Sequence, residues 1–444
     1  MKSIKILITL AFATCFILHT GAQDSIRHLS LVQACKLASD SNYRVLNAQL
    51  ETRKVHYQVR ESQSKLYPQL DGYSDFNYYY AIPKMMMPGE MFGGTGEIAM
   101  EIGTKYDWSS GFKGSLNLIN LSNFTAIKLA KRMQNLSELS LEQKKEELVY
   151  QVVQVYYLCQ STRSQISYLE KNMQNTDRML GILKNQNENG VARRIDYSKV
   201  LVTKNNLQSQ IDNLEKLLEQ QVNLLKYLTG LNSSTNVELT DSLTLTANGT
   251  NIDLPNSANH TDIKLIDKQI EIAELNRQTV NQTYLPTLSA AGQYYYQGQQ
   301  NAFSFFQGKD KFFKVGYVGL NLSVPIFDGF GKHSKAQQYK IEMLQLQNTR
   351  KNTTEGYQKD YRNAVKQYSY SLKTVVRQQE NITIAEEDYN ASLQRYRQQV
   401  MPLSDLLLSE NSLTEARLSL VDALLQLKNA ELEIKKIKGE LLNF

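Results

Sequence analysis

The chain has 444 residues, of which 41% are hydrophobic and 21% charged, with only 22 glycines and 7 prolines. Such a composition favours long helices over a doubly wound α/β fold. The formal net charge is +6, small for this length, and acidic and basic residues are mixed along the chain. Nucleic-acid binding, which needs basic residues clustered on one face or tail, is therefore not expected.

The N-terminus has the features of an export signal. Lys2 and Lys5 precede an apolar run, 6–18, that is too short for a membrane anchor, and Thr20-Gly21-Ala22 offers small residues for cleavage. We predict a signal peptide at 1–22; a retained anchor is the alternative. No other stretch has the roughly 20 apolar residues of a membrane-spanning helix, so insertion into a membrane would require β-strands.

The next segment changes from helical to strand periodicity. Residues 29–66 contain neither proline nor glycine and predict a helix, which Pro68 ends. In 69–81 and 106–121 the period becomes two, and polar residues alternate with Trp108, Phe112, Leu116 and Leu118. We predict two strands whose apolar positions face lipid, although half-buried strands of a soluble protein show the same alternation.

Very long helices follow. From 123 to 188 there is no proline and one glycine, which predicts roughly 100 Å of helix. The last helix is the most regular, because large residues alternate with small ones at seven-residue spacing: Leu406, Leu413, Leu420, Leu427 and Ile434 against Ser409, Ala416, Ala423 and Ala430. This predicts closely packed antiparallel helices in coiled-coil geometry.

The order of elements repeats in the second half. Residues 287–298 and 312–326 predict two further strands, with lipid-facing positions at Val318, Leu320 and Leu322. In the helical part, Asp196 and Gly230 recur 209 residues later as Asp405 and Gly439. We therefore predict two structural repeats, 23–230 and 263–444, each with a helix, two strands and two long helices.

Two segments fit neither pattern. Residues 231–262, rich in Asn, Ser and Thr, predict an irregular linker between the repeats. Residues 82–105 contain five of the 11 methionines. Thioethers suit soft metals, but no cysteine or histidine stands nearby, so we interpret this segment as a flexible apolar surface loop. No metal site or cofactor is predicted.

Four strands cannot close a membrane barrel, because the smallest such barrels have about 8. An open sheet edge in lipid would leave backbone groups unpaired, at a cost of several kcal/mol each. If these strands lie in a membrane, the chain must oligomerise, and three copies would supply twelve strands.

Catalytic patterns are missing from the sequence. The five histidines are scattered singly, without metal-ligand spacing, and there is no phosphate-binding glycine loop or Gly-x-Ser-x-Gly motif. We therefore predict that the protein is not an enzyme.

With these features the chain resembles the TolC-like outer-membrane efflux proteins from about Leu29 to Leu442. The resemblance rests on the duplication, on the strand entry at 285–288 (Leu-Pro-Thr-Leu) and most specifically on the strand exit at 320–329 (Leu-Asn-Leu-Ser-Val-Pro-Ile-Phe-Asp-Gly). It implies an α+β membrane protein. Four strands per chain would contribute to a trimeric twelve-stranded β-barrel in the outer membrane, continued by a coiled-coil α-helical tunnel through the periplasm.

The resemblance also implies a function and partners. The homotrimer would act as the exit duct of a tripartite efflux or type I secretion system. It would receive substrates from a periplasmic adaptor and an inner-membrane pump of RND, ABC or MFS type, and outer-membrane lipid would surround its barrel. The substrate and the particular pump do not follow from the sequence.

Members of the family are gated by polar contacts between the turns that join the long helices. Tyr396, Asp196 and Asp405 match the tyrosine and acidic positions of that gate. The arginine expected between them is Met401 here. As a hypothesis, Arg193 and Arg194 of the neighbouring turn substitute for it, although both residues equally suit an exposed turn.

Two other classes of protein remain open. A soluble periplasmic coiled-coil scaffold, whose strands cap its helices, would have the same helical pattern. A secreted enzyme would require a catalytic constellation that the sequence lacks. The strand faces distinguish the first from a duct, because only a duct needs an unbroken apolar face over all four strands.

Overall fold

The computed structural model describes residues 27–189, 193–245, 260–306 and 312–442. Its contacts divide the chain into two compact units. The strand unit consists of Glu51–Glu138 and Leu265–Arg350, and the helical unit of Met1–Leu50, Leu139–Lys264 and Lys351–Phe444. The predicted signal peptide lies outside the described residues.

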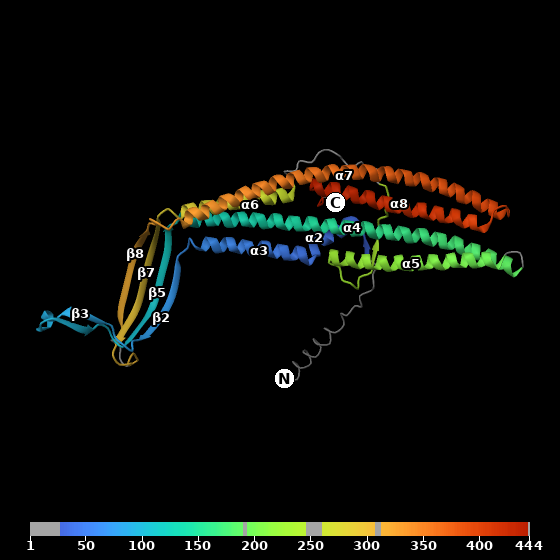
Figure 1. The fold of residues 1–444 in the computed structure, drawn as a ribbon. Helices are drawn as coiled ribbons and strands as arrows, with labels where there is room; N and C mark the ends of the chain where they lie inside the picture. The colour runs from blue at the N-terminus through green and yellow to red at the C-terminus, as the bar shows by residue number, and fades with distance from the viewer. Residues whose placement is uncertain (1–26, 190–192, 246–259, 307–311, 443–444) are drawn as a thin grey trace, which may run out of the picture. The chain divides into compact units, whose positions relative to one another are not determined.

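Among the described helices, the six longest can be matched between the two halves of the chain by their nearly equal lengths (Figure 1). The pairs are α3 (Tyr43–Ser64) and α6 (Thr261–Gln282), 22 residues each; α4 (Leu121–Glu188) and α7 (Gly331–Arg397), 68 and 67; and α5 (Arg194–Thr229) and α8 (Leu403–Lys438), 36 each. One member of each pair comes from each half of the chain, in the same order. The predicted internal duplication is therefore confirmed in the fold.

One antiparallel sheet contains the four predicted strands, in the order β2 (Gln69–Tyr78), β5 (Tyr106–Ile119), β7 (Thr287–Gln300) and β8 (Phe313–Ser323). Pro68 and Pro286 stand directly before β2 and β7, where a proline ends the preceding helix and favours extended backbone. The central pair, β5 and β7, joins the two halves of the chain edge to edge (Figure 1).

The helix predicted over 29–66 is interrupted. It consists of α2 (Leu31–Ser41) and α3, which are separated at Asn42. The buried Asn42 side chain donates from Nδ2 to the carbonyl of Leu228 (2.9 Å) and accepts at Oδ1 from the amide of Arg44 (2.8 Å). An asparagine that bonds backbone in this way favours a turn over a continuous helix, which explains the break without proline or glycine.

The two segments without periodicity are more ordered than predicted. Within 82–105, β3 (Lys84–Pro88) and β4 (Glu97–Glu101) form an antiparallel hairpin that encloses the 3₁₀ turn η2 (Gly89–Phe92), so the segment is a hairpin where a loop was predicted. Met85 and Met86 are exposed, as expected of a surface segment. In the linker, β6 (Val237–Leu239) pairs in parallel with β1 (Arg27–Leu29). The linker residues 246–259 lie outside the described part of the chain.

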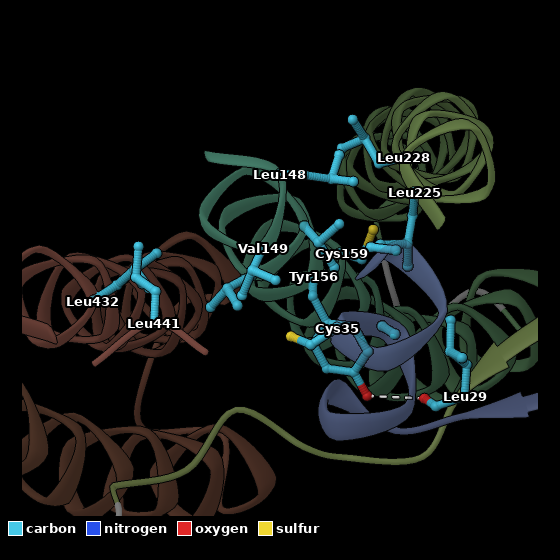
Figure 2. Close-up of a cluster of buried hydrophobic side chains, with 14 of the residues drawn as sticks. Leu29, Cys35, Leu148, Val149, Tyr156, Cys159, Leu225, Leu228, Leu432 and Leu441 are labelled. Carbon is cyan, nitrogen blue, oxygen red and sulfur yellow. Dashed lines mark hydrogen bonds between the residues drawn. The ribbon is translucent and has the colours of Figure 1, made fainter. Parts of the chain in front are cut away.

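The largest core of the helical unit lies where α2, α4, α5 and α8 meet (Figure 2). Tyr156 is fully buried there, and its hydroxyl donates to the carbonyl of Leu29 over 3.0 Å. Cys35 and Cys159 are buried free thiols of the same cluster. Burial raises the pKa of each thiol to about 12, which keeps both side chains neutral.

The seven-residue pattern of α8 corresponds to its buried face. Leu406, Leu413, Leu427 and Ile434 are buried, and so are Ser409, Ala423 and Ala430. Small side chains between large ones let α8 approach its neighbours closely, as the sequence predicted.

Candidate functional site

The four-stranded sheet has two chemically different faces. Strand register places on one face the even-numbered residues of β2, β7 and β8 and, up to a bulge, of β5. This apolar face includes every predicted lipid-facing residue except Leu118, together with several apolar and aromatic neighbours: Leu70, Phe76, Tyr106, Trp108, Phe112, Leu116, Leu288, Tyr294, Tyr296, Val318, Leu320 and Leu322. Leu118 lies at the bulge, and Ile119 takes the register position opposite Leu288.

The apolar face is exposed in the single chain. Val318 is 89% exposed, Leu320 71% and Leu322 64%. A soluble protein rarely leaves such a contiguous apolar surface open to water, because covering it with lipid or protein stabilises the molecule by roughly 25 cal/mol per Å². The face therefore requires a lipid or protein environment.

The opposite face carries polar side chains that bond to one another across strands. Asp107 of β5 accepts from Nε2 of Gln297 (3.0 Å) and of Gln299 (3.1 Å) of β7. On the same face, the Lys113 ammonium lies 5.9 Å from the ring centre of Tyr73. These groups suit an aqueous surface, so the sheet separates an apolar from a polar environment.

Aromatic residues gather at both ends of the sheet. At the end near β3, Phe76 and Trp108 contact Phe305, which follows β7. At the helix-bearing end, Phe327 packs edge-on against Phe330, with ring centres 5.6 Å apart, and both are exposed. Two aromatic groups flanking an apolar band are typical of strands that cross a membrane, where aromatic rings prefer the interfaces.

The turns that join the long helix pairs meet in one apolar cluster of the helical unit, which we call the tip cluster. Its buried members are Met179 and Leu183 of α4, Val200 of α5, and Leu403 and Leu406 of α8; Tyr197, Tyr389, Leu393, Tyr396 and others pack against them. Asp177 of α4 forms an ion pair with Lys204 of α5 (2.6 Å). The tip cluster therefore brings together turns from the two halves of the chain.

Asp196 and Asp405 occupy equivalent places beside this cluster. Each is the third residue of its helix, and its backbone amide donates to the carbonyl of the residue before the helix. Asp196 donates to Arg193 (3.0 Å) and Asp405 to Pro402 (3.2 Å). A carboxylate in the first turn is favoured by the partial positive charge of a helix N-terminus. Asp405 is exposed, and Asp196 is half-buried.

The structure brings two of the predicted gate residues together. Burial, and then the negative charge of Asp196, raise the pKa of Tyr396. Arg193 and Arg194 are exposed, and the ion pairs formed by described residues do not include either of them. Part of the first turn, 190–192, lies outside the described residues.

Among the described helices, none is both long and apolar enough to cross a membrane. Nor do the described residues contain a group of three or more His, Cys, Asp or Glu side chains that could hold a metal ion.

Comparison with known proteins decides the family. The sequence profile described as "Outer membrane efflux protein" matches residues 34–231 and 257–440, most of the chain. The chain belongs to the outer membrane efflux protein family. As a member, it is an outer-membrane protein of efflux systems, and its helices extend into the periplasm. Among curated proteins, none matches it in sequence.

Solved structures share the fold of this efflux protein. The outer-membrane channel CmeC of Campylobacter jejuni matches with a TM-score of 0.75 at 15% identity, over 92% of this chain and 85% of that one. The outer-membrane protein VceC of Vibrio cholerae matches with 0.73 at 13% identity, over 92% and 96%. CusC matches with 0.73 at 15% identity, over 95% of both chains. The predicted fold class, an internally duplicated α+β membrane protein with four strands and long helices, is confirmed.

The structure of this efflux protein reveals one residue of the tip that the sequence did not point to. Glu410 of α8 is only 5% exposed, and its Oε1 has no hydrogen-bond partner among the described residues. Burial raises its pKa to about 7. One indication was present in the sequence, because Glu410 directly follows Ser409 of the seven-residue pattern. Without the neighbouring helices, however, a glutamate at this position is taken for a surface residue.

Proposed function

We propose that this efflux protein is the exit duct of a tripartite efflux or type I secretion system. Three copies close their sheets into one twelve-stranded barrel in outer-membrane lipid, and their helices form a tunnel. Substrates enter from a periplasmic adaptor and an inner-membrane pump of RND, ABC or MFS type and pass outward without any reaction. Each repeat, 23–230 and 263–444, contributes two of the four strands and two of the four long helices of one copy.

The main support for this proposal is the four-stranded sheet. Its outer strands, β2 and β8, each have one strand neighbour in the four-stranded sheet, so two rows of backbone groups are open. The adjoining apolar face is exposed over β8. Lipid requires every backbone group to be paired, and closure between copies satisfies both edges at once. Strands of 10 to 14 residues are long enough to cross the hydrocarbon layer at the usual tilt.

Similar proteins support a channel. The structures that share this fold include one solved in the context of "transmembrane channel formation", that of CusC, and an "open state" of the MtrE outer-membrane channel of Neisseria gonorrhoeae. The polar sheet face gives such a channel a hydrated lining.

The tip is proposed as the gate of the duct. Three copies of Asp405 would form a ring of carboxylates at the narrow end, where they attract cations and repel one another. Tyr396 and Asp196, which lie close together, would hold the two turns of one copy in register. Arg193 and Arg194 are proposed to pair with acids of a neighbouring copy.

A matched pair of substitutions on β8 tests the membrane assignment. Leu320 and Asn321 are adjacent and exposed but lie on opposite faces of the sheet. A lysine on the lipid face at mid-membrane costs about 2–4 kcal/mol, whereas a lysine in the lumen is hydrated. We expect Leu320→Lys to reduce the oligomer recovered from outer membranes, and Asn321→Lys to leave it unchanged.

The competing function, a soluble periplasmic scaffold, predicts a different result. Its strands would meet water or protein on both faces. Equal recovery of both variants, in a fraction that is soluble without detergent, would support the scaffold and exclude the duct.

A further inference from the structure

The buried carboxyl of Glu410 has no part in substrate passage through the proposed duct. It lies on α8, seven residues beyond the start of the helix at Leu403 and next to the tip cluster. Oε1 is buried without a hydrogen-bond partner among the described residues. A buried ionised carboxylate without a partner is strongly unfavourable, so the group must be neutral or the packing around it must change.

The helices around Glu410 are held by contacts within one chain. Asn172 of α4 donates to the hydroxyl of Thr414 (2.8 Å), one turn beyond Glu410 on α8. Arg417 of α8 pairs with Glu386 of α7 (2.7 Å). Because its own chain already encloses Oε1, association of further copies cannot bring it a partner unless these helices move.

Charged neighbours do not neutralise the carboxylate. On α7, burial and then the nearby charge of Glu410 raise the pKa of Tyr389, while Arg397 and Arg417 act on it in the opposite direction. Glu386 is engaged by Arg417, and on the α4 and α5 side Asp177 is engaged by Lys204. Burial alone accounts for the raised pKa of Glu410.

We propose that Glu410 is a proton-binding site that controls the packing of α8 at the tip. Its neutral carboxyl keeps α8 packed against α4 and α7, and its ionisation loosens this packing beside the turn that carries Asp405. The inference extends the proposed gate by assigning it a regulator, the proton concentration of the periplasm.

The pKa of Glu410 in the packed and opened states decides how pH changes the stability of the packed tip. The packed state holds the proton up to a pKa of about 7, whereas an opened state releases it near the ordinary value of 4.5. The packed state binds more protons, so its advantage is complete below pH 4.5 and is lost as the pH rises toward 7. The tip packing is therefore tightest in acid and loosest at neutral and alkaline pH.

Hydrogen exchange of the intact, detergent-solubilised oligomer tests the proposal. We expect protection of amides in α8 next to Glu410, after correction for intrinsic exchange, to fall about tenfold or more between pH 5 and pH 8. Glu410→Gln, which cannot ionise, should show high and pH-independent protection. Glu415→Gln, a change at an exposed acid of the same helix, should behave as the wild type.

Two results would overturn the proposal: wild-type protection that does not change with pH, or a Glu410→Gln protein that follows the wild-type profile. Glu410→Leu provides a second non-ionising variant if the glutamine variant does not assemble. Exchange reports packing whether or not the oligomer conducts ions. A pH-dependent α8 in a protein without channel activity would thus contradict the proposed duct and leave the proton site standing.

Discussion

Gly230 and Gly439 end the two 36-residue helices in the same left-handed conformation, each with φ of 71°. They stand at equivalent positions of the two halves. Their surroundings differ, because a β-carbon added to Gly230 would lie 2.7 Å from the carbonyl oxygen of Ser41, whereas nothing lies within 4 Å at Gly439. The duplication has kept the helix ends and changed what packs on them.

This difference predicts unequal effects of the same substitution. Both Gly230→Ala and Gly439→Ala force a side chain into the left-handed region, at a cost of about 1–2 kcal/mol. Gly230→Ala must also displace the backbone at Ser41. We expect its thermal unfolding midpoint, followed by circular dichroism of the detergent-solubilised protein, to fall clearly below that of Gly439→Ala. Equal midpoints would show that α2 does not pack on this cap.

The sheet offers a second matched pair of glycines on its polar face. A β-carbon at Gly111 would lie 2.3 Å from the carbonyl oxygen of Tyr294, whereas nothing lies within 4 Å of one at Gly319. Gly111→Ala should therefore disturb the pairing of β5 with β7, which joins the two halves of the sheet. We expect little assembled Gly111→Ala oligomer on semi-native gels and normal amounts of Gly319→Ala; normal assembly of both would contradict this pairing.

Adjacent tyrosines test the core of the helical unit. The buried hydroxyl of Tyr156 donates to Leu29 and contacts Asp241 at 2.9 Å, whereas the Tyr157 hydroxyl has no such bond among the described residues. Removing the Tyr156 hydroxyl deletes its hydrogen bond, while the Leu29 carbonyl still accepts from the amide of Thr240 (3.2 Å) and Asp241 from the amide of Leu31 (2.8 Å). Tyr156→Phe should therefore lower the unfolding free energy by about 0.5–1.5 kcal/mol, the net value of one hydrogen bond, and Tyr157→Phe should change it little. Denaturant titration of both variants measures the difference.

Much of the fold could be predicted from the sequence because its signals are local. Pro68 and Pro286 mark the change from helix to strand, and the period-two alternation around Trp108 and Leu320 gives the faces of the sheet. Seven-residue spacing along α8 predicted its buried side.

The hairpin at 82–105 was missed although its pairing is local, whereas the other misses depend on distant contacts. Asn42 breaks a helix because its side chain bonds to the carbonyl of Leu228, far away in sequence. The three-residue strand at Val237–Leu239 exists only through its pairing with Arg27–Leu29. Glu410 is buried where α8 packs near Tyr389 of α7 and where Asn172 of α4 bonds to Thr414 one turn away. No periodicity in the sequence reveals such partners.

The central claim, a duct whose narrow end is lined by Asp405, is tested most directly by single-channel conductance of the purified oligomer in planar bilayers. We predict long-lived, cation-preferring openings in the wild type, a reduced cation preference in Asp405→Asn, and wild-type behaviour in Glu415→Gln, because only the first change removes charge from the ring. A protein that stays soluble without detergent and forms no channel would contradict the duct. Openings whose selectivity is the same in Asp405→Asn would contradict the place of Asp405 in the gate.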